Sequence, residues 1–484
     1  MSSSSSSIVS TTTSVVAVVS TTLLVYLQWR NAPEWIKQGL WSNSSSDSDG
    51  ANTRNDDLLD KDANDDLASL PAVMDKLKQM YNLVSAVSDD VEQSNWMGDW
   101  QLMAAFYSLL HLNTELLAKD PDYRDKLYDD HHHDDDVELE EVLELAKYLD
   151  YAQWAYLSSH TELSKNCRHA GLDLMTHDTA TEPGRVAHYI ALQHSQKLAI
   201  IGLKGTNTFS DIMTDLIALP KKHAGCHFDN GAFAKPKSGD KDPVNEVYCH
   251  EGIFTAAIWM ADAVQPMIEN MLVPLNYKVI ICGHSLGAGT ACLLGLELRS
   301  RIAAFRENTT DLRVLAFATP PVISYKAARA CEPFVTSVVN NTDVVCRCSV
   351  SNLIIMYKLL NEVTARLNAK GLTLDSWTSI QNYYKEHSVV DDDLLMTEEE
   401  LDTFFEETHA DPEKDDQALY VPGRCVVMWD KGENDDFAMG GIVTDGGMKM
   451  LRQVELALSF ITDHIVPSYR TSLQKLIQQK ENTI

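Results

Sequence analysis

Ser285 lies in a short stretch whose residue types suit nucleophilic chemistry, Gly283-His284-Ser285-Leu286-Gly287-Ala288-Gly289. An apolar run ending at Cys282 precedes it, and a second apolar run begins at Thr290. A serine between a buried strand and a helix must occupy a tight turn, and small residues on both sides of it let the two elements approach. The new helix would direct its amide groups and positive dipole end at an oxyanion. We therefore predict that Ser285 is the nucleophile of an acyl-transfer reaction.

A structural Gly-rich turn and a phosphate-binding loop are the alternatives for this stretch. The sequence lacks the dinucleotide pattern GxGxxG, and no Gly-Lys-Ser or Gly-Lys-Thr ends the loop. The placement between a buried strand and a small-residue helix favours the nucleophile over both alternatives.

A serine nucleophile needs a base, and the base needs a carboxylate to orient it. After a strand–serine–helix unit, the acid and then the histidine follow along the chain. Asp343 comes just past the predicted strand Phe334–Val339, at the sheet edge where Ser285 should also lie. Asp343 is therefore the predicted acid, because no carboxylate of the acidic run at 391–416 follows a strand.

Three histidines after Asp343 are candidates for the base: His387, His409 and His464. The first two lie in an acidic insertion, whereas His464 follows the last predicted strand and its helix. We therefore predict that His464 is the base. The neighbouring Asp463 is expected to be a turn residue.

The oxyanion hole is predicted from a second strand end. The run Leu198–Leu203 leads into Gly205 and Thr206, whose amide and hydroxyl could reach the oxyanion. Thr206 and the backbone N–H of Leu286 are the predicted donors, and losing one such donor typically costs ~2.7–4 kcal/mol. This chemistry uses no metal and no cofactor, and none is expected.

Other polar groups are assigned structural roles. His250 precedes the nucleophile strand, out of order for a triad, and is expected to be a buried histidine that hydrogen-bonds across the sheet. Cys346 and Cys348 have no second Cys/His pair nearby to complete a metal site. The run Asp-Asp-His-His-His-Asp-Asp-Asp at 129–136 favours a solvated loop, because adjacent side chains rarely converge on one ion.

The elements that must position these residues alternate between strands and helices, which predicts a mostly parallel sheet covered on both faces. Short apolar runs give the strands Val186–Leu192, Leu198–Leu203, Lys278–Cys282, Arg313–Phe317, Phe334–Val339 and Arg424–Met428. Longer stretches give the helices Ile253–Leu272, Ala288–Arg306 and Met450–Phe460. With the serine unit, this order indicates an α/β-hydrolase fold, with an N-terminal helical extension and an acidic insertion.

The charge and cysteine content of the sequence limit which binding partners and which cellular compartment are expected. The 484 residues include 40 Lys+Arg and 70 Asp+Glu, a formal net charge of -30. Nucleic acid is an improbable partner, because phosphate binding requires a basic surface. The nine cysteines are an odd number without a disulfide-like spacing, which favours reduced thiols and a cytosol-like compartment.

The predicted organisation has five parts: a Ser/Thr-rich N-terminus (1–41), an acidic Ser/Asp linker (42–66), a helical extension (67–136), the hydrolase domain (137–475) and a C-terminal tail (476–484). Within the hydrolase domain, residues 364–418 form an acidic insertion that is expected to be a lid or an unpacked regulatory loop.

Residues 8–29 carry no charge and are long enough to cross a bilayer as a helix. A membrane anchor, a cleaved targeting segment and a disordered tail all remain open for them. Arg30 and Lys37 follow directly, so an anchor would leave the catalytic part on the cytoplasmic side. The alternative is targeting to an organelle.

Together these residues resemble the class 3 (fungal-type) lipase family, and the diacylglycerol lipases within it. The resemblance covers roughly residues 140–475 and rests on Lys204-Gly205-Thr206 with Asp211 and Asp215, Val247–Gly252, Gly283–Gly289, Phe317–Pro321, Asn341–Val345, Tyr420–Arg424 and Asp463-His464. It implies an α/β-hydrolase fold, the triad Ser285, Asp343 and His464, and Thr206 in the oxyanion hole. Lys204 departs from the family, which usually has Arg at that position.

The resemblance also implies a substrate and a lid. We expect hydrolysis of diacylglycerol or triacylglycerol esters at a membrane or droplet surface. A phospholipase A1 or galactolipase acting on membrane lipids is the alternative, and an inactive lipase-like scaffold is a third possibility. The apolar stretch Phe209–Leu219 corresponds to the family's lid region and could equally be core packing or a lid that opens at lipid surfaces.

Overall fold

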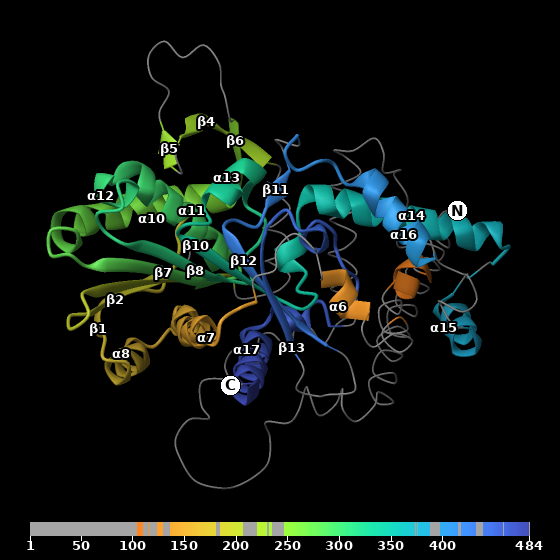
Figure 1. The fold of residues 1–484 in the computed structure, drawn as a ribbon, viewed down its shortest axis with the longest axis horizontal. Helices are drawn as coiled ribbons and strands as arrows, with labels where there is room; N and C mark the ends of the chain where they lie inside the picture. The colour runs from red at the N-terminus through yellow and green to blue at the C-terminus, as the bar shows by residue number, and fades with distance from the viewer. Residues whose placement is uncertain are drawn as a thin grey trace, which may run out of the picture.

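The structure is a computed structural model that describes residues 104–109, 116, 123–128, 136–180, 184–206, 220–229, 232–234, 246–372, 374, 376–387, 397–414, 418–431, 439–457 and 459–483. The segments predicted as N-terminus and linker, the lid stretch 209–219 and residues 129–135 of the histidine-rich run lie outside these residues. Figure 1 shows the described elements as an α/β arrangement around one large sheet.

The large sheet has the strand order β1-β2-β3-β7-β8-β10-β12-β13. Its centre, from β3 to β12, is parallel, and antiparallel pairs close both edges. The strands are β1 (Asp173–Asp178), β2 (His188–Gln193), β3 (Leu198–Leu203), β7 (Lys278–His284), β8 (Leu312–Phe317), β10 (Val335–Asn340), β12 (Arg424–Asp430) and β13 (Met439–Asp445). Each predicted strand is present with ends shifted by at most two residues, whereas β1 and β13 were not predicted. This sheet is that of an α/β-hydrolase fold.

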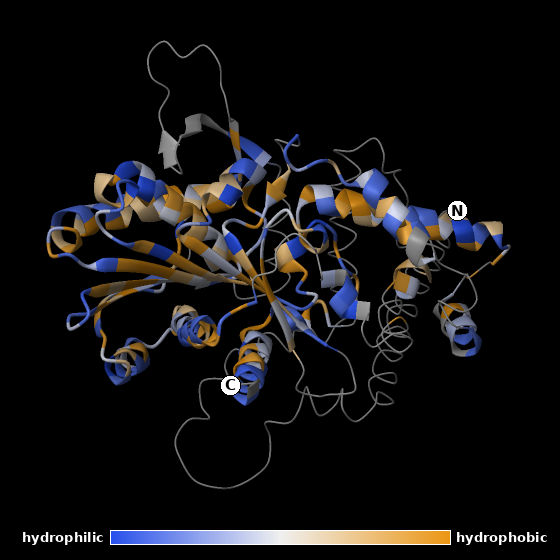
Figure 2. Ribbon diagram, viewed as in Figure 1, coloured by the Kyte–Doolittle hydropathy of each residue, from blue (hydrophilic) through white to orange (hydrophobic). Residues whose placement is uncertain are grey.

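Helices cover both faces of the sheet, as Figure 1 shows. On one face lie α10 (Glu251–Met267), continued by a π-helical turn (Ile268–Leu272), and α11 (Leu286–Arg301), followed by α12 (Ala303–Arg306). On the other lie α7 (Leu139–Trp154), α8 (His160–His169) and α17 (Val466–Thr483). The apolar colouring of the central strands in Figure 2 agrees with burial on both faces.

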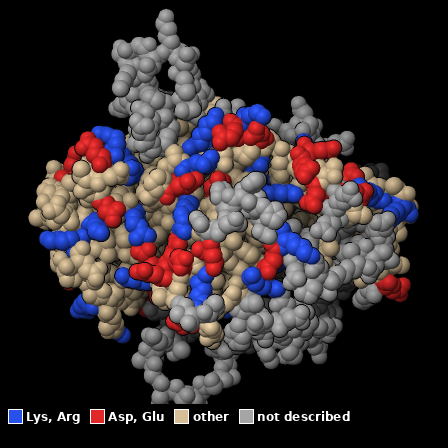
Figure 3. Space-filling view, viewed as in Figure 1, with Lys and Arg blue, Asp and Glu red and all other residues tan. Residues whose placement is uncertain are grey.

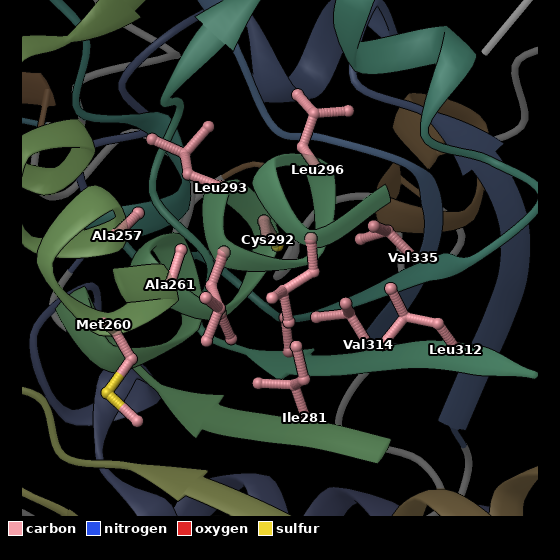
Figure 4. Packing of buried hydrophobic residues seen from close by; sticks show 14 of the residues in the cluster. Ala257, Met260, Ala261, Ile281, Cys292, Leu293, Leu296, Leu312, Val314 and Val335 are labelled. Carbon is pink, nitrogen blue, oxygen red and sulfur yellow. The ribbon is translucent and has the colours of Figure 1, made fainter. Parts of the chain in front are cut away.

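The core between the sheet and helices α10 and α11 is built from small and branched side chains. Figure 4 shows Ala257, Met260 and Ala261 of α10 facing the helix that carries Cys292, Leu293 and Leu296, with Ile281 and Val314 beneath from the sheet. The small residues of α10 allow it to approach α11 closely. The helix that begins at the serine is therefore packed on all sides, and most of its residues are buried.

A smaller antiparallel sheet has the order β11-β9-β6-β4-β5. It consists of β4 (Pro220–Asp229), β5 (Ala232–Ala234), β6 (Glu246–His250), β9 (Ile323–Ser324) and β11 (Leu419–Tyr420). Short α13 (Tyr325–Ala330) follows β9.

The acidic insertion is in large part packed structure, which corrects the expectation of an unpacked loop. Helix α14 (Val350–Ala369) runs into it, and α15 (Trp377–Glu386) and α16 (Glu398–Thr408) lie within it. Leu367, Leu374 and Ile380 are buried in one apolar cluster with the helical residues 104–109 of the N-terminal extension. These buried apolar side chains, which lie between the acidic residues in the sequence, stabilise the packed insertion. In Figure 1 the insertion lies on the side of α14 and α16.

The predicted helix Met450–Phe460 is wrong. Only Lys449–Leu451 forms a 3-10 turn, and the chain then continues without helical structure to residue 457. The carbonyls of Met450, Leu451 and Arg452 accept hydrogen bonds from the side chains of Arg347, Asn352 and His409. In an α-helix each of these carbonyls would instead accept from the backbone N–H four residues further along the chain. The long-range side-chain donors take the place of those N–H groups.

On the face seen in Figure 3, lysine and arginine side chains lie interspersed with acidic side chains. The acidic Ser/Asp linker at 42–66 lies outside the described residues. Eight cysteines have a described side chain, and all eight are buried and free. Within the described ranges, no helix is both long and apolar enough to cross a membrane; residues 8–29 lie outside those ranges.

Candidate active site

Ser285 sits at the sharp turn between β7 and α11. Its backbone has φ 60 and ψ -131, a conformation that a residue with a side chain rarely adopts. The neighbouring glycines permit this turn, because a Cβ on Gly283 would overlap the Gly287 carbonyl and one on Gly287 would come within 2.5 Å of the Leu203 oxygen. The end of β7, the end of β3 and the start of α11 therefore meet at the serine.

The structure brings Ser285, His464 and Asp343 together from three distant parts of the chain. The Ser285 Oγ lies 3.0 Å from His464 Nε2, and His464 Nδ1 lies 3.0 and 3.2 Å from the two Asp343 oxygens. All three side chains are buried. A carboxylate only accepts, so His464 Nδ1 donates to Asp343, and Nε2 is left to accept the Ser285 proton.

Asp343 follows β10 by three residues, and its carboxylate is held on both oxygens. The Val345 amide donates to Oδ1 at 2.9 Å, and the buried Tyr469 hydroxyl donates to Oδ2 at 2.7 Å. Burial acts to raise the pKa of Asp343, but the adjacent His464 and these hydrogen bonds outweigh it and hold the pKa below its ordinary value. Asp343 is thus kept ionised, although it is fully buried.

The backbone that carries Asp343 is fastened by a buried cation that the sequence did not reveal. Arg347 is 0% exposed, and it donates to the carbonyls of Asp343 (2.9 Å) and Asn341 (2.8 Å) and to the Tyr128 hydroxyl (3.0 Å). The Glu455 carboxylate lies 3.9 Å from Arg347 and balances its charge. No local signal identifies this arginine, because its partners come from residues 128 to 455.

Asp463 is not a plain turn residue, which corrects the expectation for it. It lies in a 3-10 turn (Thr462–His464), and its buried carboxylate accepts from the Thr342 amide (3.2 Å), the Thr342 hydroxyl (2.7 Å) and the Ser459 hydroxyl (2.8 Å). Burial raises the pKa of Asp463 to about 6 despite these hydrogen bonds. Asp463 thereby joins the loop of the histidine to the loop of the acid.

Of the two predicted oxyanion donors, Leu286 directly follows the serine, and Thr206 follows a glycine that packs against the serine turn. Leu286 is the first residue of α11, so no carbonyl one turn earlier in the helix occupies its amide. Gly205, directly before Thr206, packs against the elbow so closely that a Cβ on it would come within 2.6 Å of the His284 oxygen and 3.3 Å of the Gly287 nitrogen. The turn that carries Thr206 thus borders the start of α11.

The remaining candidates lie elsewhere. His409 donates to the Arg452 carbonyl (3.0 Å), and His387 stacks on Tyr383. His250 is buried at the start of α10, where its Nδ1 accepts from the Ile253 amide; its ring caps a helix, whereas the sequence predicted a bond across the sheet. Among the described residues, no group of three or more His, Cys, Asp or Glu side chains could hold a metal.

Comparison with known proteins finds similarity to lipases. A family model described as Lipase (class 3) matches residues 200–353. Over 181 residues the chain is 25% identical to mouse "Diacylglycerol lipase-beta", an alignment that covers 37% of this chain and 24% of that protein. Human "Diacylglycerol lipase-alpha" is 26% identical over 181 residues, 34% of this chain and 15% of that protein. The "Lipase" of Rhizopus niveus is 26% identical over 114 residues, 23% of this chain and 24% of that protein.

The match therefore spans about a quarter or less of the length of these relatives. Among solved structures, the lipase from Rhizopus microsporus var. chinensis aligns with a TM-score of 0.39 and 17% identity, covering 68% of this chain and 87% of that one. The matched residues 200–353 contain β3, the serine turn and the acid loop, and this part of the chain is similar to the class 3 lipase family.

Proposed function

We propose that this protein is a lipase that hydrolyses acylglycerol ester bonds through Ser285, His464 and Asp343. The observation that carries the proposal is the continuous hydrogen-bonded chain from Ser285 Oγ through His464 to Asp343. It is set at the turn between a parallel strand and a helix, where a serine can meet a substrate carbonyl.

In the first half of the reaction, Ser285 Oγ attacks the ester carbonyl carbon while its proton moves to His464 Nε2. The carbonyl oxygen becomes an oxyanion, which the Leu286 amide and Thr206 stabilise. The tetrahedral intermediate then collapses as the bond to the alcohol oxygen breaks. His464 gives its proton to that oxygen, and the acyl group stays on Ser285.

The second half repeats these steps with water. His464 Nε2 accepts a proton from a water molecule as its oxygen attacks the acyl-enzyme carbonyl, and the proton then returns to Ser285 Oγ when the fatty acid leaves. Asp343 stays ionised throughout and stabilises the imidazolium that forms twice. The lowered pKa of Asp343, held by His464 and Tyr469, supports this role.

Acylglycerols are the proposed substrates because the family and the names of the relatives both refer to lipases. A phospholipase A1 or galactolipase would use the same three residues, and an inactive scaffold would not require them to be in contact. A lipid panel separates these cases: diacylglycerol, triacylglycerol, phosphatidylcholine and galactolipid, each offered as an emulsion with the released fatty acid titrated.

Fluorophosphonate labelling tests the nucleophile without any choice of lipid. Ser285→Ala should abolish both labelling and fatty-acid release, whereas Ser300→Ala, at the far end of the same helix, should retain both. Ser300 bonds only the Leu296 carbonyl of its own helix, which makes it a matched control. Undiminished labelling of Ser285→Ala would refute the assignment of the nucleophile.

We also propose that residues 8–29 hold the enzyme at a membrane, with the catalytic part on the cytoplasmic side. Their uncharged composition and the Arg30 and Lys37 that follow support this proposal. Carbonate extraction of cell membranes should retain the full chain and release a variant that lacks residues 1–41. Release of both would favour a cleaved targeting segment or a soluble tail.

A further inference from the structure

The His284 ring lies directly beside the base. His284 ends β7, precedes Ser285 and is buried. Its Nε2 lies 2.8 Å from the backbone oxygen of His464, and the two imidazole rings are 4.9 Å apart between centroids. His284 thus contacts the backbone oxygen of His464, the proposed base, whereas Ser285 contacts the His464 ring.

The tautomer of His284 follows from its partners. Burial, and then the nearby His464, lower the pKa of His284 to about 3, so the ring is neutral and carries one N–H. The His464 carbonyl can only accept, so the proton lies on Nε2 and Nδ1 is an acceptor. The Tyr156 hydroxyl lies 3.2 Å from Nδ1 and is the donor that fits this acceptor.

The Tyr156 hydroxyl also connects two other parts of the site. It lies 3.3 Å from the His284 carbonyl, and the Gly205 amide hydrogen-bonds to it. Gly205 is packed so tightly that a Cβ there would come within 2.5 Å of this hydroxyl. One phenol therefore contacts the turn that carries Thr206, the end of β7 and the ring that holds His464.

We propose that Tyr156 and His284 are positioning residues that hold the His464 backbone in register with Ser285 and the oxyanion turn. The path runs from the Gly205 turn through the Tyr156 hydroxyl and the His284 ring to the His464 carbonyl. It is separate from the path Ser285–His464–Asp343 and meets it only at His464. This inference rests on the proposed function, since it gives the two residues a part in that reaction.

Two substitutions of nearly equal size distinguish positioning from simple filling of space. In His284→Gln the side-chain amide nitrogen can take the place of Nε2 and donate to the His464 carbonyl. In His284→Asn the amide reaches only the place of Nδ1, so the buried carbonyl loses its donor. Tyr156→Phe keeps the ring and removes only the hydroxyl.

The readout is the rate at which a fluorophosphonate labels Ser285 in the full-length protein, measured against reagent concentration. The maximal rate should fall roughly 10- to 100-fold in His284→Asn and about fivefold in Tyr156→Phe, with His284→Gln restored to near the wild-type rate. The half-saturating concentration should change little, because none of these groups touches the reagent. Equal loss in the Gln and Asn variants, or no loss in Asn, would overturn the proposal.

A second measurement does not depend on catalysis. The His464 Nδ1 proton, which is hydrogen-bonded to Asp343, should give a low-field proton resonance in the wild type and in His284→Gln. The resonance should broaden or disappear in His284→Asn at a temperature where thermal melting shows all variants folded. If the wild type were not labelled at Ser285, the proposed function would fail, while this resonance would still decide whether His284 positions His464; an unchanged resonance in His284→Asn would reject it.

Discussion

At the scale of single residues, substitutions of Asp343 and Tyr469 test whether Asp343 is the acid of the triad, because they should lower turnover by very different amounts. Asp343→Asn keeps the shape of the side chain and removes its charge, so it should lower turnover of a soluble ester by about 10⁴-fold. Tyr469→Phe removes one of several bonds to the carboxylate and should cost only about fivefold. Turnover and melting temperature are measured together, and near-normal turnover by a folded Asp343→Asn would reject the acid assignment.

Asp463 should make the stability of the fold depend on pH. Its pKa is about 6 in the folded state against the ordinary 3.8, so the folded protein favours the protonated form. The resulting stabilisation is fully present below pH 3.8 and is lost as the pH rises through about 6. From pH 8 to pH 5 the wild type should therefore gain about 1.4 kcal/mol of unfolding free energy relative to Asp463→Asn.

Urea unfolding of both proteins at several pH values measures this gain. Asn cannot ionise, so groups that titrate alike in both proteins cancel from the comparison. A difference between the two proteins that stays constant from pH 5 to pH 8 would show that Asp463 keeps its ordinary pKa.

At the scale of elements, the glycines of the serine turn set how closely β3 approaches α11. A Cβ in Gly287→Ala would come within 2.5 Å of the Leu203 oxygen and 2.9 Å of the Gly205 nitrogen, both of them backbone atoms. We expect a loss of about 1–3 kcal/mol or more in stability, together with slower labelling of Ser285. Gly252→Ala is the control, since its nearest neighbouring atom would be 3.8 Å away. A Gly287→Ala protein as stable as Gly252→Ala would contradict this packing.

The sequence predicted correctly those elements whose signal lies within a few neighbouring residues. Apolar runs marked the central strands because those strands are buried on both faces, and the glycines around Ser285 marked the turn. The segment 450–460 was misassigned because Arg347, Asn352 and His409 capture its carbonyls from elsewhere in the chain. Two further hydrogen bonds, from Thr342 to Asp463 and from His284 to His464, also join residues that are far apart in the chain. The spacing of residues in the sequence therefore could not predict them.

At the scale of the whole molecule, the N-terminal extension contacts residues that support the candidate active site. The short α6 (Tyr123–Tyr128) places Tyr128 against Trp429, with ring centroids 5.0 Å apart, and its hydroxyl accepts from Arg347. The Arg124 guanidinium donates to the Asn341 side chain. Residues before the predicted start of the hydrolase domain thus help to fasten the backbone on which Asp343 stands.

Tyr128→Ala should therefore affect both stability and activity. Removing a fully buried aromatic side chain should cost about 3–5 kcal/mol. Labelling of Ser285 should also slow, because Arg347 loses a partner beside Asp343. Lys126→Ala, exposed on the same helix, should stay within about 0.5 kcal/mol of the wild type. Urea unfolding and labelling check both, and a neutral Tyr128→Ala would show that α6 is peripheral.

The burial of Ser285, 0% exposed in this arrangement, has a kinetic consequence. A reagent or ester can react only during intervals when the serine is uncovered, so every measured rate constant is the intrinsic one multiplied by the open fraction. If the serine were covered about 99% of the time, the apparent second-order rate constant would be roughly a hundredth of its intrinsic value. Gating, as much as the strength of the triad, would set how fast this protein works.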